Sequence, residues 1–329
     1  MILAAGFGTR LFPLTIDRTK PAIPFLGKPL VGYVAEYIAK FGFTDVVVNL
    51  HHQPESVKKA LGDGANYGVK IHYTLEEPKI LGTAGALDNA RRYLEDETFL
   101  IINGKIITDI DISAALETHR HSGALATMVL KPNPTRERFT IVETEGNLIT
   151  GFGDFPERDS RLAAQEIQNP LMFTGIHILE PRVFDYIPRG VYSDIVPTFY
   201  RPAIAAGEKI VAHITDGNWF ELSTIPRYLD ISLTMLNGQK EKIVRGENVK
   251  ISASATVKDS VIWDDVTIAD GAQISKTIIA DGVKIGKGER FENVAIVRAE
   301  MLNHCDEIPE KALRGYLHGE NYVVPLNQW

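Results

Sequence analysis

Near its start the chain reads Leu3-Ala4-Ala5-Gly6-Phe7-Gly8-Thr9-Arg10-Leu11-Phe12-Pro13-Leu14-Thr15, followed by Lys20-Pro21. A short apolar strand candidate, Ile2–Ala5, runs directly into a glycine-containing loop. Gly6 and Gly8 let the backbone approach a ligand closely, so that free amides can face phosphate oxygens. Arg10 and Lys20 add two cations to the same loop. This combination favours a triphosphate bound at the carboxyl end of a parallel sheet, although the spacing fits neither a dinucleotide-binding fingerprint nor a Walker loop.

Outward from this stretch, apolar runs alternate with amphipathic stretches up to about residue 240. Buried parallel strands read as continuous apolar runs, and helices show a period of 3.6 residues. The pattern predicts a Rossmann-like α/β fold, a mostly parallel sheet with helices on both faces. The expected strands are Asp45–Leu50, Lys70–Thr74 and Phe99–Ile102, and the expected helices are Leu30–Phe41, Pro54–Leu61 and Thr83–Leu94, the last capped by Thr83.

After Ala124 the pattern changes to shorter alternating segments. We expect an antiparallel excursion that builds one wall of a cleft, with a hairpin turn at 145–147. Its strands are Ala124–Leu130, Phe139–Glu143 and Asn147–Gly151, followed by a strand at Phe173–Leu179 and helices at Ser193–Ala206 and Ile225–Leu236.

The last part of the chain repeats itself every 17 residues. Three families of apolar positions keep this period: Ile251, Ile268 and Ile285; Val257, Ile274 and Phe291; Ile262, Ile279 and Ile296. Three short strands per coil, each with one inward apolar side chain, describe a triangular β-solenoid. The tail is expected to cap it, with helix formers at Pro309–Gly315 and the apolar pair Val323-Val324. The predicted domains are residues 1–238, the solenoid at 245–300 and the cap at 301–329.

Composition limits the functional classes further. Of 329 residues, 44% are apolar and 23% are charged, and the net charge of −7 argues against a nucleic-acid partner. The single cysteine, Cys305, cannot form an internal disulfide, which favours a reducing, cytoplasmic compartment. No stretch approaches the roughly 18 apolar residues of a membrane span. The apolar start carries no basic leader, so no signal peptide and no membrane partner are expected.

The stretch from Leu3 to Lys20 resembles the signature of the sugar-1-phosphate nucleotidyltransferases, also called nucleotide-sugar pyrophosphorylases. Further pieces agree in order along the chain. Glu77-Pro78 and Leu81-Gly82-Thr83-Ala84-Gly85-Ala86 resemble the family's base-recognition loop in the form common among mannose-1-phosphate guanylyltransferases. Asn103-Gly104, Phe173-Thr174-Gly175-Ile176, Trp219–Leu222 and Thr224–Leu229 match later motifs. A C-terminal left-handed β-helix also recurs in this family, and the left-handed sense is implied by the resemblance alone.

The resemblance implies an enzyme that makes an NDP-sugar and pyrophosphate from a nucleoside triphosphate and a sugar 1-phosphate, with GDP-mannose favoured. It implies catalytic roles for Arg10 and Lys20 and sugar contacts from Thr174 and Gly175. We expect a homo-oligomer, because solenoid faces often mediate self-association. The implied nucleotide-binding residues are Leu3, Ala5, Gly6, Gly8, Thr9, Glu77, Gly82, Thr83, Asn103 and Lys105.

The sequence departs from the family at its chemical centre. Lys105 stands where the family carries the Mg²⁺-binding aspartate, and an ammonium group repels a cation. Glu221 replaces the second metal carboxylate, and Thr140 replaces an expected glycine. The segment Gly151–Glu157 lacks the lysine that grips the sugar phosphate. The resemblance implies Mg²⁺ as the cofactor, with Glu221 and Asp109 as its candidate ligands, and Lys105 argues against it. Asp109 and Asp111 are alternatively an exposed edge or a helix cap.

Three interpretations stay open at this point. The chain is an active enzyme in which Lys105 supplies fixed positive charge; or it is a catalytically impaired homologue that binds a nucleotide or nucleotide-sugar and regulates a partner; or it is a structural or assembly subunit built on the solenoid. Loss of one direct metal ligand can cost several kcal/mol of barrier.

Overall fold

The computed structural model describes residues 1–155, 169–236, 242–305 and 307–327. The chain divides into two compact units, which we describe one at a time. Unit 1 comprises Met1–Ala5, Val34–His51 and Gly62–Trp219, and unit 2 comprises Gly6–Tyr33, His52–Leu61 and Phe220–Trp329. None of the helices in the described ranges combines the length and the apolar character that a membrane span requires.

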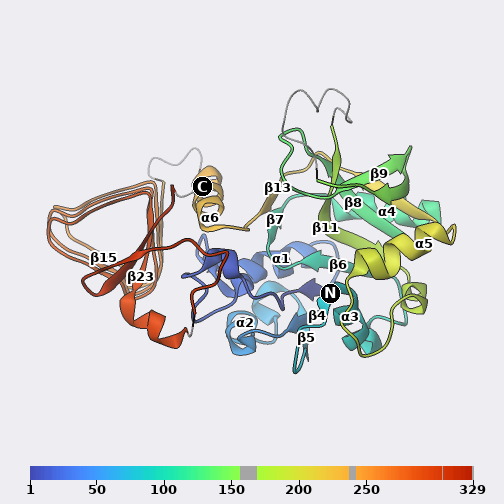
Figure 1. Ribbon diagram of the computed structural model, residues 1–329, viewed down its shortest axis with the longest axis horizontal. Coiled ribbons are helices and arrows are strands. Elements are labelled where there is room, and N and C mark those ends of the chain that lie inside the picture. The colour runs from blue at the N-terminus through green and yellow to red at the C-terminus, as the bar shows by residue number, and fades with distance from the viewer. Residues whose placement is uncertain (156–168, 237–241, 306, 328–329) are drawn as a thin grey trace. The chain divides into compact units, whose positions relative to one another are not determined.

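A nine-stranded sheet forms the centre of unit 1, in the order β5-β4-β1-β6-β11-β8-β12-β10-β9 (Figure 1). Its first four strands all run parallel, as the continuous apolar runs predict. The strands are β1 (Ile2–Leu3), β4 (Asp45–Leu50), β5 (Lys70–Leu75), β6 (Phe99–Asn103), β8 (Ala126–Pro132), β9 (Ile141–Glu145), β10 (Leu148–Phe152), β11 (Leu171–Leu179) and β12 (Ile210–Ile214).

The second half of the sheet makes it mixed rather than mostly parallel. Strand β11 runs antiparallel to both of its neighbours, β6 and β8. Strand β12 is parallel to β8, whereas β10 is antiparallel to β12 and to β9. Strands β9 and β10 form a hairpin, whose turn contains Gly146 at φ +61°. The segments expected as a separate antiparallel excursion therefore continue the central sheet to its far edge.

The helices of unit 1 are shorter than the periodicity suggests. The expected helix at Thr83–Leu94 ends at Asn89, and Thr83 is not its cap, because Leu81 occupies the N-cap position. The expected helix at Ser193–Ala206 is a π-helical turn followed by a short α5, and Pro202 in α5 has no amide to continue the ladder. The segments are α3 (Gly82–Asn89), α4 (Ile112–Ser122) and α5 (Arg201–Ala205), with turns η3 (Ala65–Tyr67), η4 (Arg91–Tyr93), η6 (Pro181–Asp185) and η7 (Val196–Tyr200), and the short strand β7 (Ile106–Thr108).

Apolar side chains from α3, η7 and α5 pack with the sheet into one core. Leu87, Ile101, Met128 and Phe199 are members with no exposed surface. At roughly 1.5–3 kcal/mol for each fully buried large apolar side chain, this core dominates the stability of the unit. It fixes the strands whose carboxyl ends carry the polar residues described below.

Unit 2 contains the loop that follows β1 and the C-terminal part of the chain. Leu11 and Leu14 are buried at 0% and 1% exposure, and they anchor the loop. Thr224 caps the last long helix by accepting a hydrogen bond from the amide of Arg227. The elements are η1 (Thr9–Leu11), η2 (Lys20–Ala22), β2 (Pro24–Phe25), β3 (Lys28–Pro29), α2 (Pro54–Leu61) and α6 (Ile225–Met235); α1 (Leu30–Ala39) and β13 (Trp219–Glu221) each cross the division between the units.

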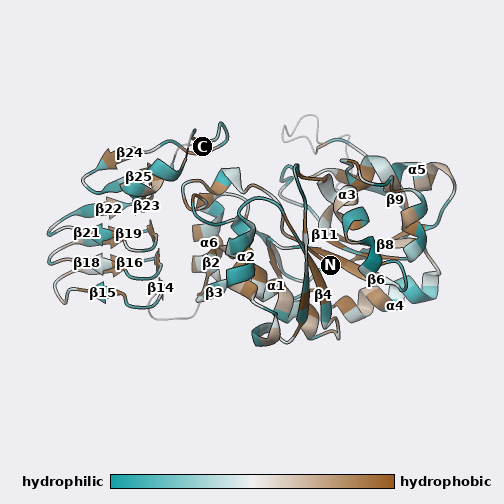
Figure 2. Ribbon diagram, turned by 90° about the horizontal axis from the view of Figure 1, so that it is seen from below, coloured by the Kyte–Doolittle hydropathy of each residue, from teal (hydrophilic) through white to brown (hydrophobic). Residues whose placement is uncertain are grey.

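The 17-residue repeat forms three parallel ladders, visible as stacked coils in Figure 2. Ile251 pairs with Ile268 and Ile268 with Ile285, so the predicted register is confirmed. The other two families pair in the same way. The strands are β14 (Ile243–Arg245), β15 (Lys250–Ile251), β16 (Thr256–Lys258), β17 (Ser260–Ile262), β18 (Thr267–Ile268), β19 (Gln273–Ser275), β20 (Ile278–Ile279), β21 (Lys284–Ile285), β22 (Arg290–Glu292) and β23 (Val294–Arg298).

The corners of the coils also keep the 17-residue period. Asp259, Lys276 and Asn293 all have positive φ, at +46°, +46° and +55°. Asn248, Asp265 and Gly282 form a second such series. Left-handed backbone lets the chain turn at a tight corner, and Asn, Asp and Gly tolerate it best.

The tail caps the last coil with a hairpin. Strand β25 (Asn321–Pro325) pairs antiparallel with β23, and β24 (Tyr316–His318) pairs with β25. Val323 and Val324 are fully buried, as expected of a cap. The expected helix at Pro309–Gly315 is wrong, because these residues form turns and irregular chain. Turn η8 (Ala299–His304) links β23 to this segment.

Candidate functional site

The carboxyl ends of three adjacent strands bring predicted site residues of unit 1 together. In the sheet register Leu3 lies between Asn49 on β4 and Asn103 on β6. The amide of Gly104 donates to the carbonyl of Leu3 at 2.9 Å, and a Cβ on Gly104 would lie 2.9 Å from that oxygen. Glycine is therefore required for this close approach. Lys105 follows half-buried at the same edge, where ligands of open α/β sheets bind.

A buried carboxylate that the sequence analysis missed ties this edge together. Glu76 has no exposed surface, and its Oε1 accepts from Nδ2 of Asn49 at 2.6 Å. Its Oε2 accepts from the amide of Leu81 at 2.6 Å, and Oδ1 of Asn49 accepts from the amide of Ala4 at 2.8 Å. The Nδ1–H of His51 donates to the carbonyl of Glu76 at 2.7 Å. Glu76 therefore couples the end of β1 to the base-recognition loop, whereas the predicted Glu77 lies exposed.

The base-recognition loop is held from behind by the segment Val191–Ile195. The amides of Ala84 and Gly85 both donate to the carbonyl of Ser193, at 2.8 Å and 3.1 Å. Gly82 has φ +74°, and a Cβ there would lie 2.6 Å from the same oxygen. The hydroxyl of Thr83 accepts from the amide of Ile195 at 2.8 Å and contacts Asp194. The first turn of α3 is thus already hydrogen-bonded within the protein, so the Thr83 side chain holds the loop.

The predicted sugar-contacting residues occupy a break in the β11 ladder. The register with β8 shifts between Phe173 and His177. Thr174 is 1% exposed; its hydroxyl donates to the carbonyl of Val129 at 2.7 Å, and its carbonyl accepts from Nε1 of Trp219 at 2.9 Å. Gly175 adopts φ +81° directly beside Asn103. Thr174 is therefore a buried anchor of the bulge, and Gly175 is the member that faces another predicted site residue.

Asp109 and Asp111 have structural partners. Both oxygens of Asp109 accept from Asn218, at 2.6 Å from the backbone amide and 2.7 Å from Nδ2. Asp111 is the N-cap of α4 and accepts from the amides of Ser113 and Ala114. The helix-cap alternative is confirmed for Asp111, and Asp109 fixes the loop at Asn218.

In unit 2 the glycine-containing loop leaves its first residues accessible. Gly6 and Arg10 are exposed, and Gly8 and Thr9 are half-buried. Gly8 has φ +68°, and a Cβ there would lie 3.3 Å from the backbone nitrogen of Lys20. The loop is closed by a 2.9 Å hydrogen bond from the amide of Leu11 to the carbonyl of Gly8. Gly8 therefore brings the two ends of the Gly6–Lys20 stretch, which we call the phosphate loop, close together.

The residues present do not fit a resident Mg²⁺. No group of three or more His, Cys, Asp or Glu side chains suited to a metal ion occurs among the described residues. Lys105 contributes an ammonium group where the resemblance implies a carboxylate. Glu221 is 6% exposed, and its carbonyl accepts from Nε of Arg227 at 3.0 Å. Mg²⁺ is held by carboxylate oxygens beside substrate phosphates, and the ammonium group of Lys105 repels a cation.

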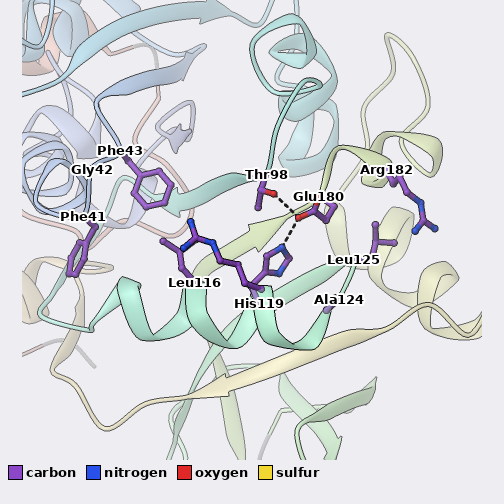
Figure 3. A pocket seen from close by; sticks show the side chains of 12 residues that line it. Phe41, Gly42, Phe43, Thr98, Leu116, His119, Ala124, Leu125, Glu180 and Arg182 are labelled. Carbon is purple, nitrogen blue, oxygen red and sulfur yellow. Dashed lines mark hydrogen bonds and ion pairs between the residues drawn. The ribbon is translucent and has the colours of Figure 1, made fainter.

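A cavity of about 540 Å³ in unit 1 contains none of the predicted site residues (Figure 3). At its centre Glu180 accepts from the hydroxyl of Thr98 at 2.6 Å and from Nε2 of His119 at 2.9 Å. Burial opposes ionisation of Glu180, but these two hydrogen bonds outweigh it and lower the pKa of this carboxyl. Thr98 precedes β6, so the cavity lies near the amino end of this strand, whereas Asn103 lies at its carboxyl end.

Comparison with known proteins places these features in a family. Residues 1–238 match the family described as Nucleotidyl transferase, and residues 233–295 match the GlmU-like, C-terminal hexapeptide family. A UTP--glucose-1-phosphate uridylyltransferase of Synechocystis sp. is 31% identical over 82% of this chain and 71% of its own length. A mannose-1-phosphate guanyltransferase of Debaryomyces hansenii is 28% identical over 78% of this chain and 72% of its own.

A solved structure supports the fold. It is a Bacillus anthracis protein described as a glucose-1-phosphate thymidylyltransferase; it aligns with a TM-score of 0.58 at 23% identity, over 72% of this chain and 92% of that one. At this identity the likeness concerns the fold alone. The family match covers the sheet, the phosphate loop and the base-recognition loop. The chain therefore belongs to the nucleotidyl transferase family, with a hexapeptide-repeat β-helix as its C-terminal part.

Proposed function

We propose that this protein transfers a nucleotidyl group from a nucleoside triphosphate to a sugar 1-phosphate, releasing pyrophosphate. A phosphate oxygen of the sugar 1-phosphate forms a bond to the α-phosphorus. The bond from that phosphorus to the bridging α,β-oxygen breaks, and pyrophosphate leaves with the electron pair. The observation that carries the proposal is the phosphate loop, which is anchored by buried leucines while Gly6 and Arg10 stay exposed. Positioning and charge stabilisation are the main demands of this chemistry.

The charged residues divide this work. Both substrates are anions, so their approach requires positive charge. Arg10 and Lys20 stabilise the β- and γ-phosphates, and the amides near Gly6, Gly8 and Thr9 contact the nucleotide. Lys105 supplies a fixed cation where the resemblance implies a metal-binding carboxylate, so no step is assigned to Mg²⁺.

Nucleobase choice is assigned to the base-recognition loop. Glu77 is exposed, and a carboxylate can accept two hydrogen bonds from the N1–H and 2-amino groups of guanine. Uracil offers only one such donor, N3–H. This chemistry favours GTP, and the resemblance of the loop to that of mannose-1-phosphate guanylyltransferases extends the proposal to mannose 1-phosphate. The similarity to a uridylyltransferase makes UTP with glucose 1-phosphate the competing pair to test.

The test is pyrophosphate release by the purified protein across four nucleoside triphosphates and three sugar 1-phosphates, with Mg²⁺ or with EDTA. We expect the highest turnover with GTP and mannose 1-phosphate. Lys20→Ala should lower turnover by about 100-fold or more, as expected when a cation that stabilises developing charge is removed. Lys40→Ala, which removes an exposed lysine, is the matched control. Nucleotide binding without pyrophosphate release from any pair would overturn the proposal in favour of a catalytically impaired homologue.

The proposal extends to the organisation of the protein. We propose domains at 1–238, 245–300 and 301–329, a left-handed coil, and a cytoplasmic homo-oligomer that does not bind nucleic acid. Light scattering that shows a monomer at micromolar concentration would contradict the assembly.

A further inference from the structure

The second half of the phosphate loop is held by the β-helix. The guanidinium group of Arg18 donates from Nε and Nη2 to the two oxygens of Asp17, at 2.9 Å and 3.0 Å. Its Nη2 also donates to Oδ2 of Asp281 at 2.5 Å, and the group lies 5.2 Å from the ring centroid of Trp263. Asp281 and Trp263 both belong to coils of the β-helix, which follow the phosphate loop by more than 240 residues. We call these three residues, Arg18, Asp281 and Trp263, the loop clasp.

The β-helix side of the loop clasp is rigid. Oδ1 of Asp281 accepts from the amide of Asp264 at 3.0 Å, which orients the carboxylate that meets Arg18. Trp263 is 3% exposed, and its Nε1–H donates to the hydroxyl of Tyr228 at 3.0 Å. The hydroxyl of Tyr228 in turn donates to the carbonyl of Pro24 at 2.5 Å. The carboxylate and the ring that receive Arg18 are therefore fixed by hydrogen bonds of their own.

The same loop segment is held on its other side by α2 and the residue before it. The side-chain amide of Gln53 donates to the carbonyl of Ile16 at 2.5 Å, and the amide of Thr19 donates to Oγ of Ser56 at 3.1 Å. Thr19 has no exposed surface. Lys20 directly follows Thr19 in the chain. The segment before Lys20 is therefore held by the β-helix on one side and by Gln53 and Ser56 on the other.

Arg18 itself is unsuited to bind phosphate in this arrangement. Two carboxylates flank its guanidinium group, so its charge is balanced inside the protein. A bidentate arginine–carboxylate pair fixes direction as well as distance. The aromatic face beneath it adds a cation–π contact. Arg18 therefore holds the loop to the β-helix, whereas Lys20, two residues later, is the candidate for contact with phosphate.

We propose that Asp281 and Trp263 are positioning residues for the reaction: through Arg18 they set the place of Lys20 for the triphosphate. This inference rests on the proposed function of the phosphate loop. It gives the β-helix a part in substrate binding in addition to any part in assembly. A displacement of a catalytic group by about 1 Å can lower the rate by up to roughly 100-fold. Loss of the loop clasp could therefore lower the rate by moving Lys20, although Asp281 and Trp263 lie far from Lys20 in the sequence.

The first test is Asp281→Asn, measured with the nucleoside triphosphate on which the wild-type protein is most active. The asparagine oxygen can accept only one of the two hydrogen bonds that Asp281 accepts, from Asp264 and from Arg18. The substitution therefore removes the negative charge that meets Arg18 and leaves one of the two donors facing an amide NH2 group. We expect the KM for the triphosphate to rise and kcat to fall, together about 10- to 100-fold in kcat/KM. The KM for the sugar 1-phosphate should change by less than about twofold. The control is Asp270→Asn, on the same β-helix, whose carboxylate accepts from Ser252 and Ser254.

Further variants keep the test decisive if Asp281→Asn folds poorly. Trp263→Phe keeps an aromatic face for Arg18 but removes the donor to Tyr228, and it should give a smaller effect of the same kind. Arg18→Asp combined with Asp281→Arg restores opposite charges and should recover part of the lost triphosphate affinity. A lowered melting temperature with an unchanged triphosphate KM would show a purely structural clasp and overturn the inference. Absence of activity in the wild-type protein would instead reject the proposed function.

Discussion

Gly175 on β11 leaves the space that the side chain of Asn103 at the end of β6 occupies. A Cβ on Gly175 would lie 2.0 Å from Nδ2 of Asn103, and the backbone at Gly175 has φ +81°. Two residues proposed for substrate binding are thus interlocked: the left-handed glycine permits the amide to lie against the bulge of β11. Any side chain at position 175 must displace Asn103 or distort the bulge.

Gly175→Ala should therefore harm both stability and turnover. The strained φ and the clash together should lower the free energy of unfolding by about 2 kcal/mol, measured by urea denaturation. The KM for the triphosphate should rise, because Asn103, which the resemblance implies as a nucleotide-binding residue, moves. Gly190→Ala is the matched control, since Gly190 has φ +67° but nothing within 4 Å of the new Cβ. Equal effects of the two substitutions would show that backbone strain alone is responsible.

Glu76→Gln should loosen the base-recognition loop. Glu76 accepts from two donors, Asn49 and Leu81, with its two carboxylate oxygens. Glutamine has only one side-chain oxygen, so one of these buried donors would face the amide NH2 group. An unsatisfied buried donor costs about 1–3 kcal/mol. We expect a lower midpoint of urea denaturation. We also expect a higher Kd for the triphosphate, measured by calorimetric titration. Glu55→Gln removes an exposed carboxylate paired with Lys58 and should leave both quantities unchanged.

Lys105→Asp tests whether the lysine is a working part of the site. If Lys105 supplies fixed charge to the phosphates, turnover in EDTA should fall at least about 10-fold, since one charge contact is replaced by repulsion. Lys105→Met, which removes the charge without reversing it, should show a smaller fall. Pyrophosphate release measured against Mg²⁺ concentration gives the answer. A large gain in Mg²⁺-dependent turnover would instead identify the wild-type site as impaired.

The buried pair His177 and Tyr200 should make unfolding sensitive to acid. Burial lowers the pKa of His177 to about 3, while its Nδ1 lies 2.6 Å from the hydroxyl of Tyr200. The unfolded chain takes up a proton near pH 6.5, and the folded protein resists it down to about pH 3. Stability is therefore lost as pH falls below 6.5, by at most about 1.4 kcal/mol per pH unit. In urea denaturation at pH 7 and pH 5, His177→Gln should flatten this dependence, and His121→Gln, at an exposed site, should not.

Sequence periodicity predicted the repetitive and buried parts of this protein well. The run Asp45–Leu50 is a strand with the predicted ends, and the 17-residue register is confirmed pair by pair. Both signals are local. A continuous apolar run or a fixed spacing predicts a strand or a repeat without knowledge of which other segments pack against it. The resemblance to the nucleotidyltransferases was confirmed over residues 1–238. The direction of β11 was not predictable, because an apolar strand carries no mark of which neighbour it will join.

The polar connections behind the proposed site were beyond sequence reasoning. Glu76 and Glu77 are identical and adjacent, yet one is fully buried and the other exposed. The hydroxyls of Thr174 and Thr83 hold backbone groups in place, and the expected contacts of these residues with substrate stay predictions. Only the register of neighbouring strands and loops decides which way such side chains turn. The roles assigned to Arg10, Lys20 and Gly82 stay predictions until substrates are tested.

The recurrence of left-handed corners at Asp259, Lys276 and Asn293 makes the β-helix modular in length. Insertion of one whole coil of 17 residues would keep the apolar side chains of the three families facing inward. Insertion of a single residue would rotate all later positions out of phase and turn isoleucines toward water. The β-helix can therefore change its length without losing its core only by whole coils.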